Sequence, residues 1–542
     1  MPPPLILITL DTTNPGTLDP YRTGRNLTPQ LASLAAQGIV YEEARTVAPL
    51  TLPAHASMLT GLYPVRHGLR DNGLAALPPA ARTLPEALSE KGYHTAAFVS
   101  AAVLGAPYGL DQGFDIYEGP SGRSAAGEHM SELSAKVTVD RAIRWLERRD
   151  PTRPFFLWVH LFDAHAPYAP QPQDLERAGG RAYLGEVLGM DREVGRLLNA
   201  LRTEKALDPA WILVAGDHGE SLGRHGELTH SLLCYDTTMR VPLILRPPFG
   251  SERAGTRAGN LVSVTDVAPT LLAAAGGRAL REIDGFDLWS APDPTRGVYM
   301  ESLNGFLAFG TSPLHAWVGA DHKYLHSSLP ELYHLPSDAS EQHNRLLQEL
   351  APAASSALAQ AKAALQRLEQ LPRLQLADQS SLSAEALESV RSLGYAGAAA
   401  ELEEFPSLLA SSELPDPAGQ AETVQRTFAA VLAGGAGQLL SAIRQLEAIL
   451  QEAPNSVYAL ERLAAFQLEA ERPADALQTL AQLLTRGGER FPTHDLLRQA
   501  HEQAGDPAQA LIHARRALEL LPGDDALGAQ LQRLEQAAGT KD

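Results

Sequence analysis

The chain has 542 residues and carries 45 Lys and Arg against 64 Asp and Glu, a formal net charge of −19 at pH 7. This length is too great for a single hydrophobic core and predicts two to four domains. The acidic balance argues against a nucleic-acid groove, which needs clustered Lys and Arg, and no run approaches the roughly 20 apolar residues of a membrane span.

The first element is an apolar run, LILITLDT at 5–12, which ends in Asp11. Such a run predicts a buried parallel strand that delivers a carboxylate at its carboxyl end. No basic region, apolar core or cleavage site of a signal peptide precedes it, so we expect a cytoplasmic protein unless an export signal is missing from this sequence. Cys234 is the only cysteine, so no intramolecular disulfide is possible.

Five further segments combine a predicted strand or helix with polar residues. One predicts a short helix near Thr51, and another predicts a second buried strand that ends in Asp217 and His218. The five segments are TLPAHASMLTGLYP at 51–64, VHLFDAHAPYAP at 159–170, WILVAGDHGESLGRHGELTH at 211–230, SVTDVAPTLLAAAG at 263–276 and ELYHLPSDASEQHN at 331–344.

Together with the first strand, these segments resemble, in order, the motifs of the sulfatases of the alkaline phosphatase superfamily over roughly the first 350 residues. The resemblance implies an α/β fold with a three-layer α/β/α catalytic domain. Thr51 occupies the position of the nucleophile, where sulfatases oxidise a Cys or Ser to an aldehyde. A threonine would yield only a ketone, so Thr51 must act as a plain alcohol, as in superfamily members that cleave phosphate esters.

The resemblance also implies a metal site made of Asp11, Thr51, Asp217 and His218. Residues at the strand ends of an open α/β sheet can meet although they lie far apart in the chain. Thr12 stands where calcium-type sulfatases have a second acidic residue. Losing that carboxylate while keeping an imidazole favours zinc, with manganese as the second choice and calcium or magnesium behind them.

Two histidines are the predicted acid catalysts. His165 matches the family histidine that contacts the ester oxygens or protonates the leaving group, and His230 stands where sulfatases have a lysine and phosphoethanolamine transferases a histidine. With Asp163 and His225, His230 could instead hold a second metal ion, as in two-zinc phosphodiesterases. The D-x-H spacing here is shorter than the D-x-x-x-H of those enzymes, which favours a single ion, with Asp163 orienting His165.

Two other positions are predicted to contact the substrate. His55 replaces the arginine that supports the nucleophile in sulfatases, so an imidazole would hold the anion there. Asn72 stands where related phosphonate and phosphodiester hydrolases have a substrate-contacting asparagine, and a simple turn residue is an equal alternative. The segment after Asp11 lacks the R-x-D pattern common in the family.

The C-terminal region repeats with a period of 34 residues. This is the spacing of tetratricopeptide (TPR) repeats, which are helix pairs that stack into an all-α array. At 420–540, such an array predicts either a short protein-binding groove or helix pairs that merely pack on the catalytic domain. Residues 351–419 are then a helical extension and linker, with an amphipathic pattern at 383–395. The repeating residues are Ala442, Ala476 and Ala510, and also Pro473 and Pro507.

The catalytic domain is therefore expected at 1–350, as a metal-dependent hydrolase that cleaves, or transfers from, a phosphate mono- or diester through a phospho-Thr51 intermediate. The ester could be small or macromolecular. The alternatives are a sulfuric ester hydrolase, a phosphoethanolamine-type transferase, and an inactive scaffold whose repeats recruit a protein partner. Because TPR repeats contact mainly their own neighbours, residues 1–418 are expected to fold and act alone on small esters.

Overall fold

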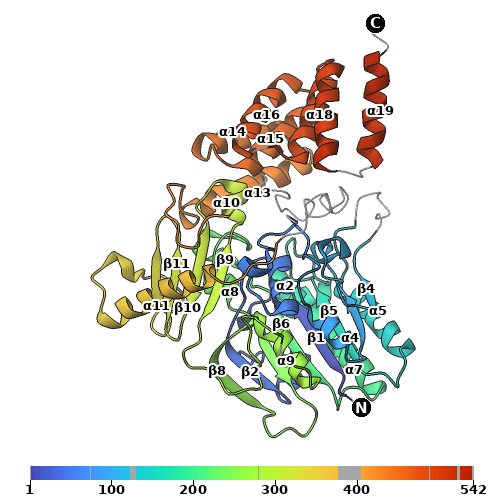
Figure 1. Ribbon diagram of the computed structural model, residues 1–542, viewed down its shortest axis with the longest axis vertical. Helices are drawn as coiled ribbons and strands as arrows, with labels where there is room; N and C mark the ends of the chain where they lie inside the picture. The colour runs from blue at the N-terminus through green and yellow to red at the C-terminus, as the bar shows by residue number, and fades with distance from the viewer. Residues whose placement is uncertain are drawn as a thin grey trace.

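The computed structural model describes residues 2–22, 24–73, 75–121, 130–278, 280–375, 405–487, 489–521 and 525–539 (Figure 1). The helical pattern at 383–395 lies outside these residues. Within them, no helix has a stretch both long and apolar enough to cross a membrane. The chain forms a large α/β part, a small sheet beside it and, at the top of Figure 1, a helical array.

A sheet of eight strands forms the centre of the large part, in the order β4-β3-β5-β1-β6-β7-β2-β8. β1 pairs in parallel with β5 and with β6, so the carboxyl ends of these three strands share one edge. β7 runs antiparallel to both of its neighbours. The strands are β1 (Leu5–Leu10), β2 (Ile39–Arg45), β3 (His94–Phe98), β4 (Ile116–Glu118), β5 (Phe155–Leu161), β6 (Trp211–Gly216), β7 (Leu243–Arg246) and β8 (Thr256–Ser263).

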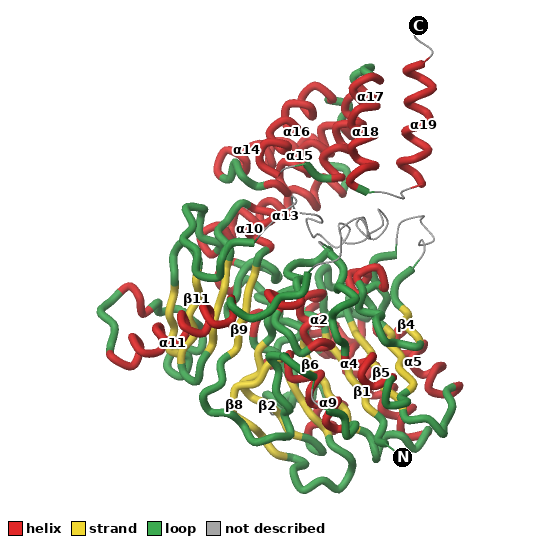
Figure 2. Tube along the Cα trace, viewed as in Figure 1, coloured by secondary structure: helices red, strands yellow, loops and turns green. Residues whose placement is uncertain are grey.

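Helices cover both faces of this sheet, which confirms the predicted three-layer α/β/α fold (Figure 2). Side chains alternate along β1, so Leu5 and Leu7 pack with α2, α4 and α9, while Ile6 and Ile8 pack with α1, α5 and α7. The helices are α1 (Pro29–Ala35), α2 (Thr51–Thr60), α3 (Pro64–His67), α4 (Leu84–Ser89), α5 (Ala135–Arg148), α6 (Pro172–Arg177), α7 (Ala182–Thr203), α8 (Asp236–Met239) and α9 (Val267–Ala274).

An antiparallel sheet of four strands, in the order β12-β11-β10-β9, adjoins the large part. The buried Lys323 of β11 connects this sheet with the large part, since its Nζ lies 3.0 Å from Oδ1 of Asp236 in α8, and it also lies 2.7 Å from Glu341 Oε1. Helix α11 contacts β10 and β11. The elements are β9 (Val298–Ser302), α10 (Asn304–Phe309), β10 (Leu314–Val318), β11 (His322–His326), β12 (Glu331–His334) and α11 (Pro352–Glu369).

The C-terminal helices form stacked pairs, α13 with α14, α15 with α16 and α17 with α18, followed by α19. The alanines that repeat every 34 residues, Ala442, Ala476 and Ala510, are all fully buried, which confirms the predicted array of TPR type. The helices are α13 (Ala421–Gly435), α14 (Leu439–Glu452), α15 (Val457–Glu469), α16 (Pro473–Gly487), α17 (Phe491–Gln503), α18 (Pro507–Leu520) and α19 (Asp525–Gly539).

The first helices of the array pack on the large part. Val424 of α13 and Tyr458 of α15 are buried in the same apolar cluster as the strands and helices of the large sheet. The ring of Phe309 in α10 lies 5.6 Å from that of Phe428 and 5.7 Å from that of Tyr458, measured between centroids. The array therefore contacts the large part as well as its own neighbours, in agreement with the alternative in which its helix pairs pack on that part.

Candidate active site

Three neighbouring parallel strands bring polar residues to one edge of the large sheet. β1 is followed by Asp11, β6 by Asp217 and His218, and β5 carries His160 just before its end. In the register of the sheet, Leu10 lies beside both Leu161 and Gly216, so the residues that follow these positions meet. All four polar side chains are fully buried.

Helix α2 adds Thr51, its first residue, to this edge. The hydroxyl Oγ1 of Thr51 lies 3.3 Å from Asp11 Oδ2 and 3.3 Å from His218 Nε2. The structure therefore brings together the four residues that the sequence analysis grouped around a metal. Gly61 ends the helix with a φ of 74°, a left-handed conformation that glycine adopts without strain.

Asn72 fixes the start of the same helix. Its Oδ1 accepts a hydrogen bond of 2.9 Å from the N–H of Leu52, one of the donors that a helix leaves without an internal partner. The Nδ2 of Asn72 is buried and has no hydrogen-bond partner in the described parts of the chain. The predicted substrate contact of Asn72 stays a prediction, and Nδ2 is the atom that could make it.

The residues at this edge fit a divalent cation. One ligand atom each of Asp11, Asp217 and His218 lies within 4.8 Å of the other two. Asp11 Oδ1 and Asp217 Oδ2 lack a hydrogen-bond partner among the described residues. Burial raises the pKa of Asp11 to about 6 and also raises that of Asp217. Two buried carboxylates without partners on these atoms are unfavourable unless a cation compensates their charge.

His160 belongs to the site but was not predicted. Its Nδ1 accepts a hydrogen bond of 3.3 Å from Ser100 N–H, so the neutral ring carries its proton on Nε2, which lies 3.2 Å from Asp11 Oδ2. Burial lowers the pKa of His160 to about 4, which keeps the ring neutral. His160 therefore orients Asp11 and leaves Oδ1 of that carboxylate for a ligand. A histidine within the apolar strand beside β1 is the signal that could have revealed it.

His55 lies one helical turn after Thr51 and is fully buried. Its Nδ1 donates a hydrogen bond of 2.7 Å to the carbonyl oxygen of Thr51, and burial lowers its pKa to about 3. The neutral ring therefore presents an unprotonated Nε2, which cannot donate to an anion. The geometry gives no support to the predicted anion contact. His55, His160 and Asp217 also form a group of metal-binding size. His160 has no free nitrogen for a cation, because its Nδ1 accepts from Ser100 N–H and its Nε2 faces Asp11 Oδ2, whereas His55 Nε2 has no hydrogen-bond partner among the described residues.

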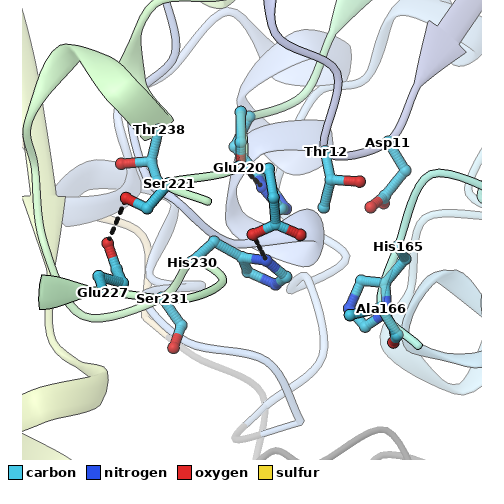
Figure 3. Close-up of polar contacts among 12 residues, drawn as sticks. Asp11, Thr12, His165, Ala166, Glu220, Ser221, Glu227, His230, Ser231 and Thr238 are labelled. Carbon is cyan, nitrogen blue, oxygen red and sulfur yellow. Dashed lines mark hydrogen bonds and ion pairs between the residues drawn. The ribbon is translucent and has the colours of Figure 1, made fainter. Parts of the chain in front are cut away.

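A second set of side chains lies on the loop 219–231. His230 Nδ1 lies 3.2 Å from Glu220 Oε1, and Tyr168 OH donates a hydrogen bond of 2.8 Å to Glu220 Oε2. Figure 3 shows the carboxylate of Glu220 directed at the imidazole of His230. The ring of His230 lies 4.5 Å from that of His218 and 5.1 Å from that of His165, between centroids. His230 thus lies beside the metal-binding group, and His165 lies beside His230.

Glu220 is the second residue of the site that sequence reasoning missed. Asn14 holds its backbone from both sides, because Asn14 Oδ1 accepts from Glu220 N–H at 3.0 Å and Asn14 Nδ2 donates to the Glu220 carbonyl at 2.7 Å. Burial raises the pKa of the carboxyl group to about 8. Glu220 therefore fixes the orientation of His230. Glu220 is the last residue of the G-D-H-G-E segment, but the sequence alone does not indicate that it pairs with His230, ten residues further on.

The second metal site considered from the sequence lacks its ligands. Asp163, His225 and His230 do not form a metal-binding group within the described ranges. Asp163 Oδ2 accepts a hydrogen bond of 2.6 Å from Ala135 N–H at the start of α5. His225 stacks on Tyr235, with ring centroids 3.8 Å apart. The loop folds back on itself and carries His225 at its tip. The closeness of His225 in sequence to His218 and His230 therefore does not place it beside them.

Comparisons with known families agree with this architecture. The model of the family described as Sulfatase matches residues 3–277, and a tetratricopeptide repeat model matches residues 435–499. The uncharacterized sulfatase YidJ of Escherichia coli (strain K12) is 25% identical over 401 residues, which are 58% of this chain and 78% of that protein. Arylsulfatase A of Homo sapiens is 28% identical over 427 residues, 64% of this chain and 83% of that protein.

Solved structures are similar in fold. The phosphonate monoester hydrolase of Agrobacterium radiobacter has a TM-score of 0.55 at 20% identity, over 68% of this chain and 95% of that chain. A structure in complex with its substrate D-glucosamine-2-N,6-O-disulfate has a TM-score of 0.58 at 22% identity, over 68% of this chain and 97% of that chain.

Proposed function

The chain belongs to the sulfatase family, as the match over residues 3–277 shows, and from this premise we propose that it is a metal-dependent hydrolase of phosphate esters whose nucleophile is Thr51. The observation that carries the proposal is the position of the Thr51 hydroxyl, 3.3 Å from both Asp11 Oδ2 and His218 Nε2. Oxidation of a threonine gives a ketone, so Thr51 cannot form the aldehyde that sulfatases make from a Cys or Ser. An alcohol beside a cation site is the nucleophile typical of phosphoryl transfer.

Asp11, Asp217 and His218 would hold the cation, together with Thr51. Mixed oxygen and nitrogen ligands favour zinc, and then manganese, over calcium or magnesium. When bound, such an ion lowers the pKa of a hydroxyl and stabilises the charge that develops on phosphoryl oxygens. The unpartnered Oδ1 of Asp11 and Oδ2 of Asp217 support this assignment.

The protein groups divide the proton transfers between them. Thr51 Oγ1 forms a bond to phosphorus while the bond from phosphorus to the leaving oxygen breaks, and the hydroxyl proton passes to Asp11 Oδ2. The leaving oxygen takes a proton from the pair of Glu220 and His230, which holds one near neutral pH because burial raises the pKa of Glu220 to about 8. Water then forms a bond to phosphorus while the bond to Thr51 Oγ1 breaks; Thr51 takes back its proton from Asp11, and the proton of the water passes to the pair of Glu220 and His230. His165 would contact the non-bridging oxygens.

Hydrolysis of sulfuric esters is the second candidate. The relatives named above are sulfatases, and one structure of similar fold holds a sulfated sugar as its substrate. The phosphonate monoester hydrolase of similar fold supports phosphorus chemistry on the same scaffold. The TPR-type array adds a surface that could recruit a protein partner or a macromolecular ester.

Four esters of one aryl alcohol test the reaction: the phosphate monoester, the phosphodiester, the phosphonate and the sulfate, each with Zn²⁺, Mn²⁺, Mg²⁺ and Ca²⁺ added separately. We expect a phosphorus ester to turn over fastest, with Zn²⁺ or Mn²⁺. Thr51→Ala should lower kcat/KM by at least ~10³-fold, and Thr51→Ser, which keeps the alcohol, should stay within ~10-fold of wild type. A preference for the sulfate with every cation would reject the proposal.

The metal content of two variants tests the proposed ligand set. Asp217→Asn should lower bound metal and activity together, since it removes a charged ligand. His230→Ala should lower activity and leave bound metal unchanged, because His230 is not one of the grouped ligand residues, although its ring lies 4.5 Å from that of His218. Loss of metal in His230→Ala, measured by elemental analysis, would show that the ligand set is wrong.

A further inference from the structure

The loop 217–231 carries Asp217, His218, Glu220 and His230, and its conformation is strained. Leu222, His225 and Ser231 have φ values of 52°, 52° and 92°, in the left-handed region that side chains with a Cβ rarely adopt. Such backbone persists only where the surroundings hold it in place. The contacts that hold this loop therefore decide where its functional side chains lie.

From the inside, a buried carboxylate holds the loop. Glu227 Oε2 accepts a hydrogen bond of 3.0 Å from Ser221 Oγ, and Glu227 Oε1 accepts one of 2.8 Å from Leu232 N–H. The backbone N–H of Ser221 also donates to the carbonyl of Thr229 at 2.8 Å, which closes the loop into a hairpin. These bonds fix the base of the hairpin. At its tip, the 3-10 turn Arg224–Gly226, the N–H of Gly223 donates to the carbonyl of Glu227 at 2.9 Å, and His225 stacks on Tyr235.

From the outside, the tip of the hairpin contacts the first helix of the array. Helix α13 packs against the turn Arg224–Gly226, and a Cβ added to Gly226 would stand 3.4 Å from the Cβ of Ala421. Ala421 and Val424 are 2% and 3% exposed and belong to the apolar cluster of the catalytic part. The active-site hairpin thus lies between the catalytic core and a helix that the repeat pattern assigns to another domain.

The segment before α13 fixes the position of this helix. Ser312 N–H donates a hydrogen bond of 2.9 Å to the carbonyl of Pro415, and Ser327 Oγ donates one of 2.7 Å to Asp416 Oδ1. The other carboxylate oxygen of Asp416 accepts from Ala418 N–H at 3.1 Å, at the entry to the helix. These bonds to loops beside the small sheet therefore fix the entry to α13, in addition to the packing of α13 on α14.

We propose that α13 is a positioning element of the active site, which holds the hairpin tip through Ala421 and thereby keeps Glu220 and His230 in their catalytic orientation. This inference rests on the proposed function only in giving His230 a part in turnover. It replaces the expectation that residues 1–418 act alone, because such a chain would lack Ala421 and Val424. A partner that displaces α13 would accordingly change kcat.

The test uses the full-length protein with Ala421→Leu, and Ala476→Leu as the matched control. Ala476 is also fully buried, but in a cluster formed by array residues alone. We expect Ala421→Leu to lower kcat by about tenfold or more, since small displacements of positioned groups are costly, with bound metal unchanged and KM within about twofold. Ala476→Leu should leave kcat unchanged. If Ala421→Leu folds poorly, Ala421→Gly removes the contact and should shift kcat in the same direction.

Two readouts separate this role from general destabilisation. In a His230→Ala background, Ala421→Leu should have no further effect on kcat, whereas multiplying effects would overturn the proposal. Hydrogen exchange at the amides of residues 221–231 should be faster in Ala421→Leu than in wild type and unchanged in Ala476→Leu. Unchanged exchange in Ala421→Leu would overturn the proposal whichever ester the protein cleaves, so this measurement stands apart from the proposed function.

Discussion

The array and the catalytic part differ in the sequence separation of the residues that contact one another. In the array, Leu463 packs with Ala442 and Ile443 of the preceding helix, so its apolar contacts join residues near one another in sequence. In the catalytic part, Thr51 and His218 meet although 167 residues separate them. A periodic sequence therefore reveals the array directly. The active site is revealed only by the order of its motifs.

The two parts also differ in the solvent exposure of their ion pairs, as one pair from each part illustrates. Arg70 and Glu301 of the catalytic part form a pair whose side chains are 3% and 0% exposed. Arg426 and Glu452 of the array form a pair whose side chains are 41% and 52% exposed. The chemistry is the same, but the surrounding medium is not. Coulombic interaction and desolvation are both strong for the first pair and weak for the second.

The largest effect is expected from Arg70→Met. Arg70 Nε donates a hydrogen bond of 2.9 Å to Glu301 Oε1, so removing the guanidinium leaves a buried carboxylate without its cation. Breaking such a pair typically costs about 3–5 kcal/mol of unfolding free energy. All five tryptophans lie between residues 145 and 317, so urea unfolding followed by tryptophan fluorescence reports on the catalytic part.

The control is the double variant Arg70→Met with Glu301→Gln, in which no buried charge is left unpaired and part of the stability should return. Far-ultraviolet circular dichroism, which also detects the array helices, should show a separate transition that the substitution leaves in place. A loss below about 1 kcal/mol in the single variant would contradict the contrast between the two pairs.

Asp11→Asn is expected to have an intermediate effect, which depends on pH in the metal-free protein. Burial raises the pKa of folded Asp11 to about 6 from its ordinary 3.8. Between these values the folded state binds more protons than the unfolded state, so wild-type stability falls as pH rises through this window and stays low above it. Asparagine carries no charge and escapes this penalty.

We therefore expect Asp11→Asn to stabilise the chelator-treated protein by ~3 kcal/mol at pH 7.5, by about half of that at pH 5 and hardly at all at pH 4. Denaturant unfolding at the three pH values measures the difference. The same variant should bind less metal than wild type, so the sign reverses when the cation is present. If Asp11→Asn stabilises the protein equally at pH 4 and pH 7.5, ionisation of the buried Asp11 does not destabilise the folded state, and the raised pKa is contradicted.

Sequence predicts those parts of this molecule whose signals are local or ordered. The ordered motifs, with polar residues at the ends of apolar strands, resemble those of the sulfatases, and this resemblance implied the three layers and the grouping of Asp11, Thr51, Asp217 and His218. The burial of Ala442, Ala476 and Ala510 followed from their spacing. These features depend on periodicity and on strand ends, both of which a single sequence displays.

The remaining parts depend on contacts that a single sequence does not display. His160 acts through the tautomer that Ser100 N–H imposes, and Glu220 acts through its bond to His230. The strained hairpin carries His225 to Tyr235 rather than to a metal ligand. Docking of α13 on Gly226 depends on the close fit of two small residues and has no periodic signature. In each case the partner is set by tertiary packing.

The smallest effect is expected from Arg426→Gln, which lies on α13 itself. Arg426 donates hydrogen bonds of 2.7 and 3.0 Å to the carboxylate of Glu452 in α14, but solvent screens the pair. The melting temperature should fall by no more than about 2 °C at low salt and by nothing measurable in ~0.5 M NaCl. We also expect kcat to remain unchanged, because Arg426 pairs with α14 while Ala421 contacts the hairpin. If Arg426→Gln lowers kcat as strongly as Ala421→Leu, the whole of helix α13, and not the single contact of Ala421, acts on the active site. The contrast between an array with contacts among sequence neighbours and an active site built from distant residues would then not hold at α13.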